Sequence, residues 1–196
     1  MPAIYIIGDS TVEDNKLPFR GWGWALPKYV KENVSIHNHA LSGRSTRSFL
    51  EEGLWDPVEK AISAGDLLLI QFGHNDEKDD ERHTDPDSTY RENLWRYCKT
   101  ALEKGAQPVL LTPVSRRFFV GGGSMLYTHG EYPRAVRELA AEKGVPLIDL
   151  KKDSRERLVQ YHSQVPPELQ VQQQVLCLLQ GFGLPESCQK DGRRQR

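Results

Sequence analysis

The sequence predicts an α/β fold, a three-layer αβα sandwich built around a five-stranded parallel sheet. Five short apolar runs recur along the chain, each bounded by Gly, Pro or Asn, and segments of helical length separate them. Parallel strands need connections of that length, because the chain must cross back from the end of one strand to the start of the next. Strand–helix alternation of this kind places helices on both faces of the sheet.

The five apolar runs are the predicted strands. They are only five to seven residues long, which is typical of strands and too short for most helices. The run in "DLLLIQFG" is apolar almost throughout, as expected for a central strand that is covered on both faces. The predicted strands are residues 3–7, 34–40, 66–72, 108–112 and 145–150.

Four segments between these runs are predicted helices. They are residues 21–31, 45–63 with a break near Gly53 and Pro57, 88–104, and 131–143. The third has the clearest pattern, because its apolar residues recur at i, i+3, i+4, i+7 and i+8 and so share one face of a helix. These residues are Leu94, Tyr97, Cys98, Ala101 and Leu102.

Composition excludes several classes of partner. The 196-residue chain has a formal net charge of -1, so nothing draws it to nucleic acid or to an anionic membrane. No apolar run approaches the ~20 residues that span a bilayer, and no secretory leader precedes the first strand, which predicts a cytoplasmic protein. The odd set of cysteines, Cys98, Cys177 and Cys188, argues against a disulfide framework and against a zinc site. Oligomeric state is left open.

The last part of the sequence differs in composition from the rest. Residues 160–196 contain nine glutamines, whereas residues 1–159 contain two. A change this sharp predicts a domain boundary, with a core at 1–159 followed by an atypical Gln-rich tail that is truncated, altered or unstructured.

Small and polar residues follow the first three predicted strands, at the edge where open parallel sheets carry their reactive groups. The segments are "GDST" at 8–11, "LSGRSTRSF" at 41–49 and "GHND" at 73–76. Acyl transfer needs a hydroxyl and hydrogen-bond donors for the oxygen that becomes negative. Ser10 offers the hydroxyl, while its own N–H, the N–H of Gly43 and the side-chain amide of Asn75 are candidate donors.

These three blocks, in this order, resemble the SGNH (GDSL-type) hydrolases. The segments "GDSTV", "GRSTRSF", "GHNDEK" and "TDPDSTYRENL" are most similar to the rhamnogalacturonan acetylesterase branch, which removes acetyl groups from pectin-derived sugars without a metal. The resemblance covers residues 3–150 and implies the flavodoxin-like form of the sandwich. It implies Ser10 as nucleophile, Gly43 and Asn75 as the oxyanion hole, no cofactor, and an acetylated sugar or oligosaccharide as substrate.

Three residues beside these groups are candidate substrate contacts: Asp9, Arg44 and His74. An arginine such as Arg44 can bind the carboxylate of an acidic sugar such as galacturonate, and a surface role is an equal alternative. His74 is expected to shape its loop rather than to act as the base.

The general base is the part of the pattern that the sequence does not supply. The family carries an Asp-x-x-His block near its C-terminus, and no such block follows Leu150. His162 follows the fifth strand, but no aspartate stands three residues before it. The base and its aspartate are therefore unknown, with His162 a weak candidate, and we expect an esterase core with little turnover on acetyl esters.

Three other functions fit parts of the sequence. Apolar residues in the loop after the fourth strand also suit a lysophospholipase, thioesterase or arylesterase of the same superfamily. The missing base block suits a carbohydrate-binding protein without activity. A nucleotide-binding flavodoxin-like protein is disfavoured, because neither Gly-x-x-x-x-Gly-Lys nor Gly-x-Gly-x-x-Gly occurs.

Overall fold

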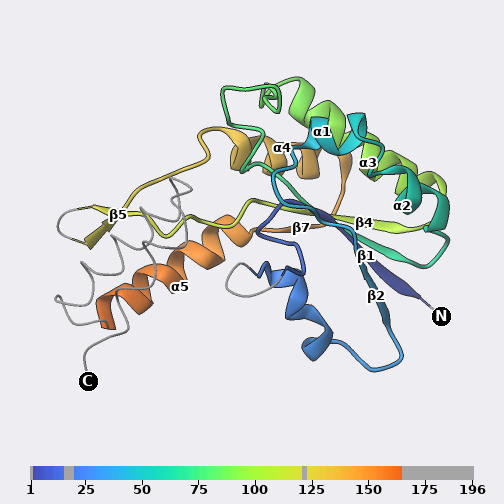
Figure 1. Ribbon diagram of the computed structural model, residues 1–196, viewed down its shortest axis with the longest axis horizontal. Helices are drawn as coiled ribbons and strands as arrows, with labels where there is room; N and C mark the ends of the chain where they lie inside the picture. The colour runs from blue at the N-terminus through green and yellow to red at the C-terminus, as the bar shows by residue number, and fades with distance from the viewer. Residues whose placement is uncertain (1, 16–19, 121–122, 165–196) are drawn as a thin grey trace. The chain divides into compact units, whose positions relative to one another are not determined.

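The computed structural model describes residues 2–15, 20–120 and 123–164 (Figure 1). Packing divides the chain into two units, which are taken in turn. The first unit comprises Met1–Val114 with His129–Lys151, and the second comprises Ser115–Thr128 with Lys152–Arg196. All strands of the parallel sheet belong to the first unit, so this unit carries the predicted fold.

The five predicted strands form one sheet in which every neighbouring pair is parallel. They are β1 (Ala3–Gly8), β2 (Ser35–Asn38), β3 (Leu67–Gln71), β4 (Gln107–Leu111) and β7 (Leu147–Ile148). The order β2-β1-β3-β4-β7 confirms the α/β prediction. Because successive connections run in opposite directions from β1, a topological switch point lies between β1 and β3, which is where open α/β sheets bind ligands.

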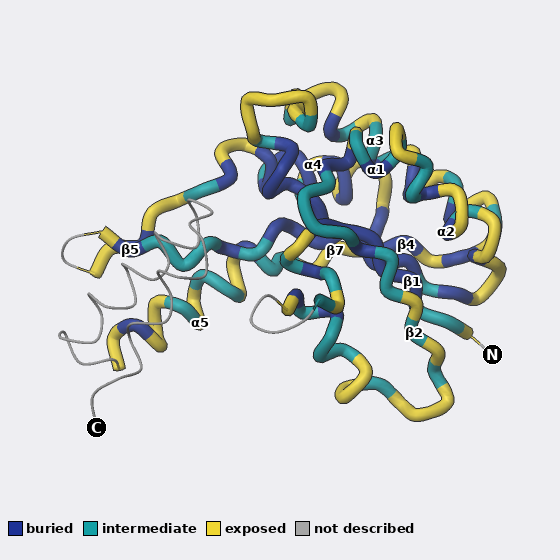
Figure 2. Tube along the Cα trace, in the orientation of Figure 1, coloured by how far each residue is buried: buried dark blue, intermediate teal, exposed yellow. Residues whose placement is uncertain are grey.

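Four α-helices pack on one face of this sheet (Figure 1). They are α1 (Thr46–Glu51), α2 (Asp56–Ala61), α3 (Thr89–Glu103) and α4 (Tyr132–Lys143). The break between α1 and α2 lies at Gly53, as predicted. The apolar face of α3 is buried except at Leu102, which is 44% exposed, contrary to prediction. Tyr97 of α3 packs edge-on against Trp55, with ring centroids 4.9 Å apart, and Figure 2 shows how burial is concentrated between these helices and the central strands.

The opposite face of the sheet is covered differently from the prediction. The helix expected at 21–31 is wrong: two short 3₁₀ helices, η1 (Trp22–Trp24) and η2 (Leu26–Tyr29), stand in its place. The hydrogen bonds inside this segment run from residue i to residue i−3, from Trp24 to Gly21 and from Ala25 to Trp22, which is the 3₁₀ pattern and not the α-helical ladder. Trp22 packs against the apolar residues of this face, which makes it a core residue.

The second unit contains a short hairpin and most of one helix. β5 (Phe119–Val120) pairs antiparallel with β6 (Ser124–Met125), and α5 (Leu150–Gln164) enters this unit at Lys152. The predicted boundary at 159–160 falls inside α5, and the predicted tail lies outside the described residues beyond position 164. No helix among the described residues has the length and apolar content that crossing a membrane requires.

Candidate active site

Three loops at the carboxyl ends of β1, β2 and β3 carry the candidate residues. Loop 1 (residues 9–15) follows β1, loop 2 (residues 39–45) follows β2, and loop 3 (residues 72–88) follows β3. Since these strands are parallel neighbours, the three loops emerge from the same edge of the sheet. The sequence blocks around Ser10, Gly43 and Asn75 are therefore brought to one place in the fold.

Direct hydrogen bonds hold the three loops to one another. Glu13 of loop 1 accepts hydrogen bonds from the backbone N–H (2.9 Å) and the hydroxyl of Ser42 in loop 2. The side-chain amide of Asn75 in loop 3 donates to the carbonyl oxygen of Arg44 in loop 2 at 2.9 Å. Arg44 in turn donates to the Ser42 carbonyl at 2.9 Å and pairs with Glu52 at 2.6 Å, so it braces loop 2.

The turn that presents Ser10 is built by its neighbours. Gly8 ends β1 where a Cβ would lie 2.5 Å from the carbonyl oxygen of Gln71, so a larger residue does not fit. Asp9 then closes the turn, because its Oδ1 accepts hydrogen bonds from the N–H (2.9 Å) and hydroxyl (2.7 Å) of Thr11. Asp9 is fully buried, whereas Ser10 is exposed at the corner of the turn.

The candidate donors have hydrogen atoms to spare. Among the described residues, neither the backbone N–H of Ser10 nor that of Gly43 donates a hydrogen bond. Gly43 adopts a φ of +80°, a left-handed conformation that favours glycine, in the turn between β2 and α1. The Asn75 amide has two N–H groups, and the bond to Arg44 uses one of them. These three N–H groups are therefore not used by the described part of the fold.

A row of buried polar side chains lies behind loop 1. Asp9 Oδ2 is 3.4 Å from Nδ1 of His74, the ring of His74 lies edge-on to His129 at 4.2 Å between centroids, and Nζ of Lys151 is 3.0 Å from Nδ1 of His129. Burial disfavours the charged form of Asp9, but nearby His74 and the hydrogen bonds of Thr11 outweigh it, and the pKa of Asp9 is lowered. His74 thus lies between Asp9 and His129, while its expected role in shaping its loop and substrate contact by Asp9 and His74 stay predictions.

Asp76 ties loop 3 to the start of α1. Its Oδ1 accepts hydrogen bonds from the N–H (2.9 Å) and hydroxyl (2.6 Å) of Thr46 and from the hydroxyl of Thr84 (2.9 Å). Burial raises the pKa of Asp76 to about 6, although these hydrogen bonds oppose the shift. Asp76 directly follows Asn75, so this network fixes the backbone from which the candidate donor projects.

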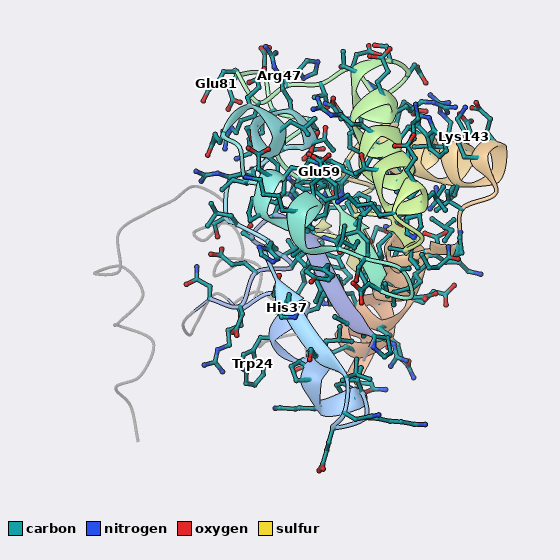
Figure 3. All side chains as sticks on the ribbon, turned by 90° about the vertical axis from the view of Figure 1, so that its right-hand side faces the viewer. Trp24, His37, Arg47, Glu59, Glu81 and Lys143 are labelled. Carbon is teal, nitrogen blue, oxygen red and sulfur yellow. The ribbon has the colours of Figure 1, made fainter. Side chains whose placement is uncertain are left out.

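The structure does not place a histidine as the base of Ser10. In the described part of the first unit, the Ser10 hydroxyl forms no hydrogen bond. His37, on β2 (Figure 3), stacks on Tyr5 with ring centroids 4.9 Å apart, as suits a structural histidine. His162 belongs to the second unit, where it stacks on Phe119 at 3.8 Å and is 6% exposed. Its role as base stays a prediction.

Sequence reasoning missed the residues that connect the loops. Glu13 and Arg82 lie in charged stretches that are typical of solvated loops, and nothing in those stretches points to Ser42 or Asn75 as their partners. Of the residues that connect the loops, only Asp76 is indicated by the sequence, because it lies inside the "GHND" block. Among the described residues, no group of three His, Cys, Asp or Glu side chains is placed to hold a metal ion.

Replacing Glu13 by alanine is expected to lower the free energy of unfolding by ~1.5–3 kcal/mol, because Ser42 would lose its charged acceptor. Urea denaturation of the wild-type chain and the variant measures this change. Glu32→Ala is the matched control, since Glu32 is exposed. Equal effects of the two substitutions would contradict a tethering role for Glu13.

Comparisons with known proteins agree with the three blocks. Residues 6–169 match the model of the GDSL-like Lipase/Acylhydrolase family. The chain is 47% identical over 150 residues to rhamnogalacturonan acetylesterase RhgT of Bacillus subtilis (strain 168), covering 75% of this chain and 64% of the relative. It is 40% identical over 155 residues to the probable rhamnogalacturonan acetylesterase YesY of the same organism, covering 77% and 71%. The chain thus spans just under two thirds of the length of RhgT.

Solved structures show the same fold. The crystal structure of YxiM from Bacillus subtilis superposes with a TM-score of 0.73 at 29% identity, covering 82% of this chain and 46% of that chain. An acetyl xylan esterase, AlAXEase, gives a TM-score of 0.60 at 17% identity, covering 85% and 84%, a likeness of fold alone. With a family model that matches most of its length and relatives at 47% and 40% identity, the chain belongs to the GDSL-like lipase/acylhydrolase family.

Proposed function

We propose that this chain carries the site of a serine carbohydrate esterase that hydrolyses acetyl esters on pectin-derived sugars. Ser10 is the nucleophile, and its own N–H, the N–H of Gly43 and the amide of Asn75 form the oxyanion hole. The observation that carries the proposal is that these donors, on loops tied to one another, have hydrogen atoms that the described part of the fold does not use.

The chemistry follows from these groups. The Ser10 hydroxyl attacks the carbonyl carbon of the acetyl ester and loses its proton to solvent water, and the carbonyl oxygen becomes negative as the tetrahedral intermediate forms. Each donor placed at that oxygen stabilises the transition state by ~3 kcal/mol. Collapse of the intermediate releases the sugar hydroxyl, which takes up a proton, and leaves Ser10 acetylated. Water then hydrolyses this acetyl-enzyme and releases acetate.

The substrate class rests on the relatives. RhgT, at 47% identity, is a rhamnogalacturonan acetylesterase, and the match to the family model, residues 6–169, includes the three loops. A sugar ester with a small acyl group also suits a nucleophile on an exposed turn, because such a position offers no deep acyl tunnel of its own. Arg44, whose side chain is 31% exposed, supplies a positive charge beside loop 2 for an acidic sugar.

We further propose that turnover by this chain is slow. No Asp-x-x-His follows Leu150 in the sequence, and in the described part of the first unit nothing bonds to the Ser10 hydroxyl. A serine without a base keeps the contribution of the oxyanion hole but loses ~10⁴ to 10⁶ of the rate of a complete triad. Hydrolysis of p-nitrophenyl acetate at rates typical of esterases would overturn this second proposal.

The proposed function is tested by following both the product and the covalent site. The full chain is incubated with acetylated rhamnogalacturonan oligosaccharides and, separately, with long-chain thioesters, and released acetate or thiol is quantified. A fluorophosphonate reagent then labels the nucleophile, and peptide mapping by mass spectrometry locates it. We expect slow acetate release, a preference for the acetylated sugar, and label at Ser10. Label on another residue, preference for thioesters, or sugar binding without any labelling would each contradict the proposal.

A further inference from the structure

Arg82 lies close to Gly43 and Asn75, the two residues other than Ser10 that offer candidate oxyanion donors. Its Nη1 donates a hydrogen bond to Oδ1 of Asn75 at 3.4 Å. The same Nη1 is 3.9 Å from the position that a Cβ on Gly43 would occupy, and it is the nearest atom to that position. One guanidinium nitrogen therefore bonds to Asn75 and lies near Gly43, and nothing in the sequence blocks indicated this residue.

Asp80 holds the Arg82 side chain in this orientation. Arg82 donates from Nε to Oδ1 of Asp80 at 2.9 Å, and its Nη2 pairs with Oδ2 of the same carboxylate. The backbone N–H of Arg82 also donates to Oδ1, at 3.0 Å. Hydrogen bonding from Arg82 lowers the pKa of Asp80 to about 2, so the pair stays charged throughout the assay range. With one edge of the guanidinium fork bound to Asp80, Nη1 is the nitrogen directed to Asn75.

The contact with Arg82 and the hydrogen bond to the Arg44 carbonyl together fix which end of the Asn75 amide is the donor. An asparagine amide can rotate to exchange its oxygen and nitrogen, and only the nitrogen can stabilise an oxyanion. An arginine side chain has hydrogen-bond donors and no acceptor, so the Asn75 atom that faces Arg82 must be the oxygen Oδ1. Nδ2 then faces the opposite way, where one N–H binds the Arg44 carbonyl and the second is left for a ligand. The side chain of Asn75 is buried, so water does not readily compensate for the wrong rotamer.

We propose that Arg82 is a positioning residue that holds the Asn75 amide in its donor orientation. The inference rests on the proposed function, because it gives Asn75 a catalytic purpose. It does not require Arg82 to touch the substrate. A direct interaction between Arg82 and a substrate carboxylate, or between Arg82 and the oxyanion itself, is a different role, and the experiment separates them.

The first measurement is a double-mutant cycle on the rate at which an uncharged fluorophosphonate labels Ser10 in the full chain. Asn75→Ala is expected to slow labelling by ~10²- to 10³-fold, as loss of an oxyanion-hole donor does. We expect Arg82→Gln to slow it by ~10-fold, since part of the Asn75 population then turns its oxygen toward the site. In the Asn75→Ala background, Arg82→Gln should change the rate by less than ~2-fold, because coupled residues are non-additive.

A second measurement follows the side-chain amide of Asn75 by NMR and needs no reaction at Ser10. The side-chain ¹⁵N–¹H pair of Asn75, assigned from its loss in Asn75→Ala, is expected to shift or split in Arg82→Gln and to move less in Arg82→Lys, which keeps the charge. Arg47→Gln is the control, because Arg47, on α1 (Figure 3), is an exposed arginine that pairs with Glu51 at 2.8 Å. The control should leave both the labelling rate and the Asn75 signals unchanged.

The outcomes are distinguishable. No labelling of wild-type Ser10 would defeat the proposed function, while the Asn75 signals would still report whether Arg82 orients the amide. If Arg82→Gln slowed labelling equally in the wild-type and Asn75→Ala backgrounds, Arg82 would act directly, and the positioning role would be overturned. Unchanged Asn75 signals in both Arg82 variants would overturn it as well. If Arg82→Gln fails to fold, as judged by thermal unfolding, Arg82→Lys carries both measurements.

Discussion

Added imidazole is expected to raise the rate at which this chain releases acetate from an acetyl ester, and Ser10→Ala is expected to abolish that increase. A positioned general base contributes ~10²- to 10⁴-fold to such a reaction, so a base supplied from solution, without the benefit of positioning, should restore ~10-fold. Ser10 is exposed on its turn, which gives a small base access to the hydroxyl. The rate is followed with 4-methylumbelliferyl acetate over a series of imidazole concentrations, after subtracting the rate without protein.

The controls make this result specific to Ser10. Ser35→Ala removes an exposed serine from the opposite end of the sheet, at the start of β2, and should leave the imidazole dependence unchanged. A chain that hydrolyses the ester rapidly without imidazole, and that Ser10→Ala silences, would show that a base already reaches Ser10. An imidazole effect that survives Ser10→Ala would place the nucleophile elsewhere and would also contradict the proposed function.

The parts of the fold that the sequence predicted well are those in which local pattern and tertiary environment agree. The run in β3 is apolar because layers cover both of its faces, and Leu68 and Ile70 are fully buried. β7 is shorter than its apolar run, since it pairs with β4 alone at the sheet edge, and Leu147 and Ile148 are 36% and 41% exposed.

The segment after loop 1 shows where local pattern fails. Apolar and aromatic residues favoured a helix at 21–31, but a Cβ on Gly23 would lie 2.3 Å from the carbonyl oxygen of Val12. Gly23 therefore packs directly on the backbone of loop 1, and its N–H donates to that same carbonyl at 3.1 Å. The backbone beyond this contact turns with hydrogen bonds from residue i to residue i−3, from Ala25 to Trp22 and from Lys28 to Ala25, and the sequence holds no local signal for that choice.

The candidate site divides in the same way. The placement of Ser10, Gly43 and Asn75 at one edge of the sheet could be predicted because they lie in the loops after β1, β2 and β3, which topology alone brings to that edge. Their supporting partners could not, because the contacts of Glu13 with Ser42 and of Arg82 with Asn75 depend on side-chain directions in irregular loops. These supporting residues nevertheless set the geometry on which an oxyanion hole depends.

Asp76 is the supporting residue with the largest expected effect on stability. Its carboxyl is buried among the donors of Thr46 and Thr84, with the charge of Asp9 nearby, and burial raises its pKa from 3.8 to about 6. In the unfolded chain the same carboxyl titrates near its ordinary pKa. Between these two values the folded chain binds more protons than the unfolded chain, so the free energy of unfolding decreases as pH rises. The raised pKa of Asp76 therefore stabilises the folded chain at acid pH, and this contribution is lost as the pH rises from 3.8 to about 6.

Replacing Asp76 by asparagine is expected to remove this pH dependence. Asparagine keeps an oxygen acceptor for Thr46 and Thr84 but stays neutral at every pH. A shift from 3.8 to about 6 corresponds to ~3 kcal/mol, of which ~0.5 kcal/mol is already lost at pH 4, so the wild-type chain should lose ~2.5 kcal/mol relative to Asp76→Asn between pH 4 and pH 7.5. Urea denaturation of both proteins at the two pH values measures the difference, and comparison within each pH cancels the titration of other groups.

Asp79→Asn provides the matched control, because Asp79 is an exposed aspartate of the same loop. Its difference from wild type should be the same at both pH values. If Asp76→Asn also differed from wild type by the same amount at both pH values, the Asp76 carboxyl would not be neutral at acid pH. It would then bind Thr46 as a permanently charged acceptor. Acidification would then leave Asp76, and the backbone of neighbouring Asn75, unchanged. A titrating Asp76 predicts instead that loop 3 and α1 are held most firmly below pH 6.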